Sequence, residues 1–406
     1  MSCSAALVKF ISSTTFKKYS MLLRFKAIAS PSYKIFIVGY WDDKLFVIVI
    51  VVHYITLTHK KKQQNFNRRQ LYTMSVALMD CTLRDGANIV GKGFDAEITD
   101  MVLDGLTSCG VPTVEFGNAG GIGAYEVAGF TQALPDDEYL DIAQKYLNRG
   151  SELGMFLNAK RYRENNVEKA KQRGLSFLRV GADAGELEIS IPPIKDIKKY
   201  GLKAFYSLMK AYILTPDELA EEAKALADAG LDQITIMDSA GTMTPDQAAE
   251  YTEKLVKAVS IPVAFHCHNN LGLSAANALA AYKSGASILD CGLMGMARSA
   301  GNLPTEVCVG MMQRYGEMKN IDLYKMLEFI ESRLMPAMLK HNYHNSITPL
   351  DLTLGISGCH SSFVKTFKAV AAEKKVNLFR LIVEVSAVNR KNPSEALMRE
   401  VADKIA

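Results

Sequence analysis

Two histidines, His266 and His268, stand two positions apart in the apolar segment FHCHNN. In a β-strand, residues i and i+2 face the same way, so the two imidazoles would project side by side. Such a pair can chelate a metal ion, while Cys267 between them would point into the wall on the other side of the strand. The alternative reading is a packed, hydrogen-bonded pair in the protein core.

Eight short apolar runs occur after residue 74, and each is followed by an amphipathic stretch. The runs are SVALMDCTL, TVEFG, LGMFLNA, FLRVGAD, KAFYSLMKAY, QITIMDSAG, PVAFHCHN and ILDCGLMG. Helix signals lie between them, such as Thr215 and Pro216 at the start and Gly230 at the end of TPDELAEEAKALADAG. Strand and helix alternating eight times predict an α/β (β/α)8 TIM barrel. An open doubly wound sheet is the alternative, but no GxGxxG follows the first run.

Polar residues at the ends of these strands would ring one mouth of the barrel, where barrel enzymes carry their active sites. Asp85, His266 and His268 would then form a two-histidine, one-carboxylate set with open positions on a divalent ion. Nitrogen and oxygen donors without a thiolate favour Mn²⁺, with Mg²⁺, Co²⁺ and Zn²⁺ as alternatives. Arg84 beside Asp85 has a second reading, an ion pair that closes the barrel end.

Three further strand-end residues, Lys210, Asp238 and Ser239, are predicted to line the substrate pocket. Hydrogen-bonded filling of the barrel is the alternative for Asp238 and Ser239. Lys210 could instead form a Schiff base with a ketone, as lysines of some aldolases do. A metal-free mechanism of that kind would leave the histidine pair unexplained.

Six motifs occur in one order along the chain, namely CTLRDG, VEFG, DSAGTMTP, HCHNNLGLSAAN, GMARSAGNLPTE and GCHSSF. With them, residues 75 to 390 resemble the HMG-CoA-lyase-like family of metal-dependent barrels, the DRE-TIM metallolyases. Within that family the 4-hydroxy-2-oxovalerate aldolases are the most similar. The resemblance implies a divalent-metal-dependent lyase that cleaves or forms a C–C bond in a 4-hydroxy-2-oxo acid. Its products would be pyruvate and an aldehyde, formed through a metal-bound enolate.

The resemblance also implies roles for individual residues. Asp85, His266 and His268 would hold the ion, with Asn302 as a further ligand or a neighbour of the ligands. Arg84 would stabilise the enolate, because a fixed guanidinium meets the negative charge that develops as the bond breaks. Glu115 would orient the Arg84 and Asp85 segment from behind.

The chain departs from the aldolase pattern at two positions. The family's LRDGxH motif has a histidine base where this chain has Asn88, and an amide cannot serve as a base. We therefore expect Asn88 only to bind substrate. The tyrosine before SSF is replaced by His360, whose imidazole titrates near neutrality and could take over proton transfer. An ordinary half-buried histidine is the alternative for His360.

Two other functions fit parts of the pattern. An acyl-CoA-dependent condensing transferase similar to isopropylmalate synthase is compatible with HCHN and GNLPTE, although the short C-terminal segment offers little room for CoA. A non-catalytic scaffold would explain the lost base, although the metal-ligand residues are intact. The resemblance further implies a small 2-oxo acid as substrate, an acylating aldehyde dehydrogenase as a partner, and a homo-oligomer.

The chain is predicted to divide into a leader (1–73), the barrel (74–318) and a helical C-terminal segment (319–406). The leader holds 12 basic against two acidic residues, which leaves 35 basic against 41 acidic in the remainder. That net charge of −6 gives no indication of nucleic-acid binding. Seven scattered cysteines without a CxxC pair indicate reduced thiols.

The leader has three readings: a disordered or non-native start, organelle targeting, or a membrane anchor. Its basic, acid-poor composition resembles a transit peptide. Its apolar run at 45–57 is shorter than the roughly 20 residues that span a bilayer. We expect a cytoplasmic protein, with organelle targeting as the alternative.

Overall fold

The computed structural model describes residues 34–41, 44–51, 75–344, 348–357, 359, 363–389 and 392–406. Residues 1–72 and 73–406 form separate compact units. In the first unit, β1 (Lys34–Trp41) and β2 (Lys44–Val51) pair as an antiparallel hairpin. No helix in the described ranges is long and apolar enough to cross a membrane.

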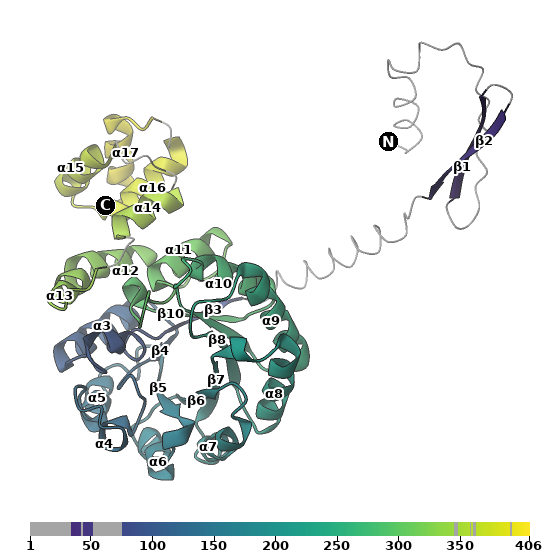
Figure 1. Ribbon diagram of the computed structural model, residues 1–406. Helices are drawn as coiled ribbons and strands as arrows, with labels where there is room; N and C mark the ends of the chain where they lie inside the picture. The colour runs from purple at the N-terminus through teal and green to yellow at the C-terminus, as the bar shows by residue number, and fades with distance from the viewer. Residues whose placement is uncertain are drawn as a thin grey trace. The chain divides into compact units, whose positions relative to one another are not determined.

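The second unit contains a closed barrel of eight parallel strands, and Figure 1 shows the strands as a ring inside a ring of helices. The strands are β3 (Ala77–Asp80), β4 (Thr113–Glu115), β5 (Glu152–Asn158), β6 (Phe177–Asp183), β7 (Lys203–Met209), β8 (Gln233–Asp238), β9 (Val263–Cys267) and β10 (Ile288–Cys291). Each pairs in parallel with its neighbours in chain order, and β10 closes the ring onto β3. All eight coincide with the predicted runs, so the expected TIM barrel is confirmed.

Each strand-to-strand crossover of the barrel contains a helix of eight residues or more. These helices are α3 (Ala96–Ser108), α5 (Asp136–Ala143), α6 (Glu164–Gln172), α7 (Leu187–Lys199), α8 (Pro216–Asp228), α9 (Pro245–Ala258), α10 (Ser274–Lys283) and, after β10, α11 (Thr305–Arg314). Thr215 and Thr244 start α8 and α9 with complete capping boxes, in which each threonine and the third helical residue satisfy each other's backbone N–H groups. A short helix, α4 (Ala124–Val127), lies between β4 and α5.

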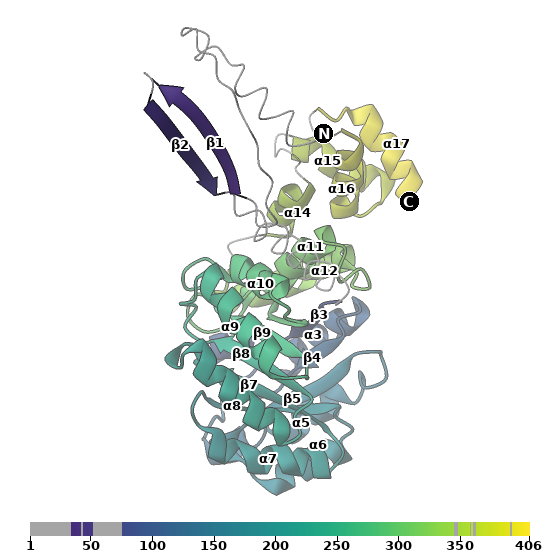
Figure 2. The same ribbon diagram turned by 90° about the vertical axis from the view of Figure 1, so that its right-hand side faces the viewer.

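The C-terminal segment is helical, as predicted. Its elements are α12 (Leu323–Phe329), the π-helical turn η5 (Ile330–Leu334), α13 (Met335–Leu339), α14 (Pro349–Ser357), α15 (Val364–Lys374), α16 (Leu378–Asn389) and α17 (Glu395–Ile405). Helix α14 contacts both α11 and α16, and α12 contacts α3, so this segment packs on the helices of the barrel (Figure 2). A separate apolar cluster, which includes Phe367, Leu381 and Met398, holds α15, α16 and α17 together.

Strand β6 shows how the barrel interior changes from one end to the other. Alternate residues of a strand face inward, and in β6 these include Phe177, Arg179 and Asp183. Phe177 stacks on Phe205 in a small apolar cluster, with ring centroids 4.6 Å apart. Arg179 makes buried ion pairs, and Asp183 lines an open cavity. The interior therefore passes from apolar through ionic to solvent-accessible toward the ends of the strands.

The barrel also buries its thiols. Cys81, Cys109, Cys267, Cys291 and Cys308 are all buried and form no disulfide. Burial raises the pKa of Cys81, Cys267 and Cys291 well above the usual range for a thiol. Reduced, protonated thiols agree with the reading of the cysteine spacing.

Candidate active site

The predicted metal ligands meet at the ends of β3 and β9. Asp85 follows β3 in a tight turn, His266 lies in β9, and His268 follows it. The Asp85 Oδ2 atom lies 3.5 Å from His266 Nε2 and 3.7 Å from His268 Nε2. One donor atom from each of the three residues lies within 4.8 Å of the others, a spacing that suits one shared ion. The structure thus brings together residues that are 183 positions apart in the sequence.

Asn302 completes this group. It forms an isolated antiparallel bridge with His268, and its Nδ2 donates to Asp85 Oδ2 at 2.8 Å. Its Oδ1 is buried and has no hydrogen-bond partner among the described residues, and the same is true of His266 Nε2. An unsatisfied buried acceptor is costly unless another group meets it. These two atoms and the carboxylate of Asp85 therefore fit a divalent cation.

The protonation states of His268 and Asp85 suit metal binding as well. Burial and the neighbouring His266 lower the pKa of His268 to about 4, so its imidazole is neutral and can act as a ligand at neutral pH. Burial opposes ionisation of Asp85, but Arg84 and the two histidines outweigh it and hold the pKa of this carboxyl well below its usual range. The site therefore offers a carboxylate and a neutral imidazole.

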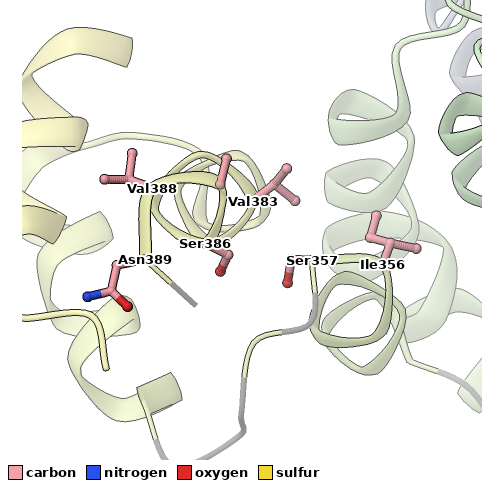
Figure 3. A pocket seen from close by; sticks show the side chains of 7 residues that line it. Ile356, Ser357, Val383, Ser386, Val388 and Asn389 are labelled. Carbon is pink, nitrogen blue, oxygen red and sulfur yellow. The ribbon is translucent and has the colours of Figure 1, made fainter. Parts of the chain in front are cut away.

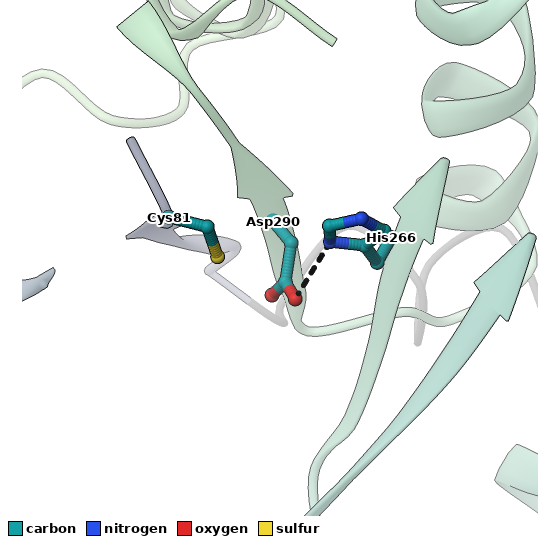
Figure 4. A group of neighbouring side chains, drawn as sticks. All are labelled: Cys81, His266 and Asp290. Carbon is teal, nitrogen blue, oxygen red and sulfur yellow. Dashed lines mark hydrogen bonds and ion pairs between the residues drawn. The ribbon is translucent and has the colours of Figure 1, made fainter. Parts of the chain in front are cut away.

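His266 is oriented by Asp290 of β10. Its Nδ1 lies 3.3 Å from Asp290 Oδ2 (Figure 4). Its Nε2 lies 3.5 Å from Asp85 Oδ2. Carboxylates that hold the second nitrogen of a metal-binding histidine commonly fix its ring and tautomer. Cys81, His266 and Asp290 also lie close enough to share an ion. However, Arg179 contacts both Cys81 Sγ and Asp290, so a guanidinium already supplies the positive charge there.

Arg84 is held by two carboxylates beside the metal ligands. Its Nε donates to Glu115 Oε2 at 2.6 Å, and its Nη1 donates to Asp85 Oδ1 at 3.0 Å. The guanidinium carbon lies 5.0 Å from the centre of the Phe156 ring. Among the described residues Nη2 has no hydrogen-bond partner, so both of its N–H bonds remain unpaired. Glu115 therefore contacts Arg84 directly, and its orienting role stays a prediction.

Glu115 and Asp290 share one cation, Arg179, which is fully buried. Its guanidinium donates to Glu115 Oε1 at 2.8 Å and also pairs with Asp290. Burial disfavours ionisation of Glu115, but Arg179 and Arg84 outweigh it and lower the pKa of that carboxyl. We call Arg84, Glu115, Arg179 and Asp290 the buried ionic network. Sequence reasoning missed Arg179 and Asp290, although a charged residue inside each apolar strand was a visible signal.

An open cavity of about 430 Å³ adjoins these groups. Of the predicted site residues, its lining includes Arg84, Asp85, Asn88, Lys210, Ser239 and His268. Asn88 donates through Nδ2 to the backbone oxygen of Asp85 at 2.9 Å, which directs its amide N–H groups to the metal-ligand turn.

Asp238 does not line this cavity. Its two carboxylate oxygens each accept a backbone N–H at 2.9 Å, from Thr242 and Met243, so it fixes the loop before α9. Lys210 does line the cavity, but its Nζ pairs with Asp183 at 2.7 Å. That hydrogen bond raises the pKa of Lys210, which disfavours the neutral amine that a Schiff base requires. His360 lies outside the described residues, and its role stays a prediction.

A second hollow, of about 490 Å³, lies between α14 and α16 (Figure 3). Its lining includes Ile356, Ser357, Val383, Ser386 and Val388. No charged side chain and none of the predicted site residues is among the described residues that form it. Of these two cavities, the one at the barrel mouth is the one lined by predicted site residues.

The fold and the site together define a TIM-barrel enzyme with a candidate divalent-metal centre. The model of the HMGL-like family matches residues 75–332, and this chain belongs to that family. It is 32% identical over 327 residues to a 4-hydroxy-2-oxovalerate aldolase of Carboxydothermus hydrogenoformans, which covers 80% of this chain and 96% of that protein. It is 31% identical over 332 residues to a protein of the same name from Moorella thermoacetica, covering 82% of this chain and 97% of that one.

A solved structure supports the fold. The HMG-CoA lyase of Bacillus subtilis matches with a TM-score of 0.56 and 20% sequence identity, over 68% of this chain and 96% of that one. The family and its curated relatives place this chain among the aldolases and lyases, so the predicted enzyme class is confirmed.

Proposed function

We propose that this protein is a divalent-metal-dependent aldolase of 4-hydroxy-2-oxo acids. It would cleave such an acid to pyruvate and an aldehyde, or form it from these two in the reverse direction. The observation that carries the proposal is the meeting of Asp85, His266 and His268 with Arg84 at one cavity. The printed names of the relatives support the same reaction type. The cavity volume suits a small substrate, because pockets for such ligands typically have about 300–1,000 Å³.

Asp85, His266 and His268 would hold the ion, with Oδ1 of Asn302 as a fourth donor. When bound, the ion polarises a 2-oxo group as a Lewis acid. Mn²⁺ is the ion we expect, because the donors are nitrogen and oxygen atoms without a thiolate.

Arg84 would contribute the fixed positive charge. Glu115 and Asp85 hold its guanidinium before the substrate arrives, so little reorganisation is needed when negative charge develops on the three-carbon fragment. The Nη2 group of Arg84 has no partner in the described part of the chain and can donate to that developing charge. An interaction that strengthens in the transition state accelerates the reaction.

Proton transfer at the 4-hydroxyl needs a base, and Asn88 cannot supply one. Its Nδ2 donates to the backbone oxygen of Asp85, and its Oδ1 lies 3.4 Å from Lys92 Nζ, so both ends of the amide are engaged. We therefore propose that His360 exchanges this proton. Replacing Asn88 by His should raise aldolase turnover if the base limits the rate.

The experiment that tests the proposed function is pyruvate release by the full chain from a panel of 4-hydroxy-2-oxo acids, with added Mn²⁺ and with EDTA as the control. Pyruvate that forms with Mn²⁺ and stops with EDTA would establish the reaction. Silence across the panel would refute the aldolase assignment, and release of free CoA from an acyl-CoA and a 2-oxo acid would then support the condensing transferase.

The proposed partners rest on the resemblance to the aldolases. An acylating aldehyde dehydrogenase would consume the aldehyde product, and size-exclusion chromatography of the mixed proteins would detect such a complex. The same measurement on this chain alone tests whether it is a homo-oligomer.

A further inference from the structure

Two cations, Arg161 and Lys92, lie against the aromatic ring of Phe130, and a third, Arg298, lines the same cavity as Phe130. Arg161 lies in the turn η2 (Ala159–Arg161) after β5, and its guanidinium carbon is 5.7 Å from the centre of the Phe130 ring. Lys92 Nζ is 5.0 Å from the same centre. Arg298 is exposed in the loop after β10 and lines the cavity together with Phe130 and Arg161. We call Lys92, Arg161 and Arg298 the Phe130 cations.

Arg161 is held in place rather than free in solvent. Its Nη2 donates to the backbone oxygen of Gly120 at 2.7 Å. A Cβ atom at Gly120 would lie only 2.5 Å from the Phe130 ring, so the absence of a side chain lets this backbone approach the aromatic ring. The Nε of Arg161 is buried and has no hydrogen-bond partner within the described ranges. A guanidinium held in this way lines the cavity.

The charges of the cavity do not balance without a ligand. Arg84 is paired with Asp85 and Glu115, and Lys210 is paired with Asp183. For the Phe130 cations, no carboxylate of the described chain lies within ion-pair distance. Burial alone lowers the pKa of Arg161, and burial together with Arg298 lowers the pKa of Lys92. The electrostatic environment thus opposes the positive charges instead of stabilising them.

We propose that the cavity binds a substrate with a second anionic group, a carboxylate or a phosphate ester, at the end that becomes the aldehyde. Arg161 and Arg298 would contact this group, with Lys92 adding long-range attraction. Planar guanidinium groups suit both anions, because two N–H groups can donate to two oxygens at once. A substrate with only a methyl group at that end would leave all three cations without a counter-charge.

The assignment of this anion to the aldehyde end rests on the proposed aldolase function. In that reaction the 2-oxo acid end lies at Asp85, His268 and Arg84, which leaves the Phe130 side of the cavity for the remainder of the molecule. The binding of an anion at Arg161 and Arg298 does not depend on the reaction, so the two ideas can be tested apart.

The first experiment measures anion binding to the full chain without turnover. Isothermal titration with malonate and with inorganic phosphate should give saturable binding, and Arg161→Gln or Arg298→Gln should weaken it at least tenfold. Arg163→Gln is the matched control, because Arg163 is exposed, is two residues away and does not line the cavity. Equal binding by Arg161→Gln and the unaltered protein would overturn the proposal. Arg161→Lys keeps the positive charge, so it should retain part of the anion binding that Arg161→Gln loses.

The second experiment compares aldehydes that differ in one anionic group. Condensation with pyruvate is measured for succinic semialdehyde against butanal, and for glyceraldehyde 3-phosphate against glyceraldehyde. We expect kcat/KM at least tenfold higher for the charged member of one pair, with the preference lost in Arg161→Gln. The pair that responds distinguishes a carboxylate from a phosphate ester.

The outcomes separate the two proposals. If no aldehyde condenses but Arg161→Gln still loses anion binding, the aldolase function fails and the anion site stands. If condensation proceeds with equal kcat/KM for charged and neutral aldehydes, the assignment of the anion to the substrate is overturned while the aldolase function stands.

Discussion

The buried ionic network and the Phe130 cations lie beside the same cavity, yet they differ in how their charges are met. In the network, Glu115 bridges Arg84 and Arg179, and Asp290 pairs with Arg179 from the other side. Around Phe130, the described structure supplies one aromatic ring, one backbone oxygen and the side-chain oxygen of Asn88, but no carboxylate. Charges that are paired within the protein, as in the network, hold other groups in position. Cations at a cavity without a paired carboxylate, as around Phe130, indicate that the ligand supplies the negative charge.

The largest expected effect is at the metal ligands, which contact the buried ionic network. His268→Ala should remove the bound divalent ion and lower pyruvate formation by about 1,000-fold or more, equivalent to about 4 kcal/mol. Metal content by mass spectrometry and the pyruvate assay check this result, with the exposed His341→Ala as the control. Because both charged regions remain intact, malonate binding should survive. A full complement of metal in the variant would contradict the assignment.

Arg179→Met should destabilise the fold strongly. It leaves Glu115 and Asp290 buried without their shared cation, and breaking a buried ion pair from one side typically costs about 3–5 kcal/mol. Urea denaturation at pH 7.5 measures the loss. Without Arg179 the pKa of both carboxyls should rise, so the deficit should shrink toward pH 5, where they can be protonated. A loss below about 1 kcal/mol would mean that the network is not balanced as described.

Glu306 tests the same comparison with a buried acid that pairs with no cation among the described residues. Burial raises its pKa to about 7. Because the folded pKa lies above the unfolded one, stability is lost as the pH rises from about 4.5 through 7. Glu306→Gln removes this loss, so the variant should gain about 2–3 kcal/mol relative to the unaltered protein between pH 5 and pH 8. Urea denaturation at both pH values checks it, and a pH-independent difference would contradict it.

The smallest expected effect is on stability at the Phe130 cations. Arg298→Gln should change the free energy of unfolding by less than about 0.5 kcal/mol, because the exposed side chain makes no ion pair in the described chain. Thermal and urea unfolding measure this change. A loss above about 1 kcal/mol would show that Arg298 stabilises the fold. The Phe130 cations would then not differ from the buried ionic network in this respect.

Most of the fold could be predicted because each strand is a short apolar run and the helices begin with strong local signals, as at Thr215 and Thr244. His266 and His268 could be predicted because two-residue spacing in a strand places both on one face. Asp238 shows the limit, since a position at a strand end predicts the mouth but not which hydrogen bonds the side chain makes. Its carboxylate is taken by the N–H groups of its own loop.

The groups missed in the sequence depend on long-range contacts. In the sequence, Arg179 is a charged residue within an apolar strand, and its partner is not apparent. Closure of the barrel brings Asp290, 111 positions away, into contact with it. Arg161 and Phe130 come from different crossover loops, whose conformations leave no periodic pattern. Pairing of this kind follows from the closed ring and not from local sequence.

The buried thiols of the barrel can report local opening of the folded protein. The thiolate is the form that reacts with alkylating reagents, and the native barrel both covers Cys81, Cys267 and Cys291 and holds them protonated. Cys81 and Cys291 belong to the seam where the last strand meets the first. Under native conditions, the rate at which Cys81 and Cys291 are alkylated would therefore report how often β3 and β10 separate locally.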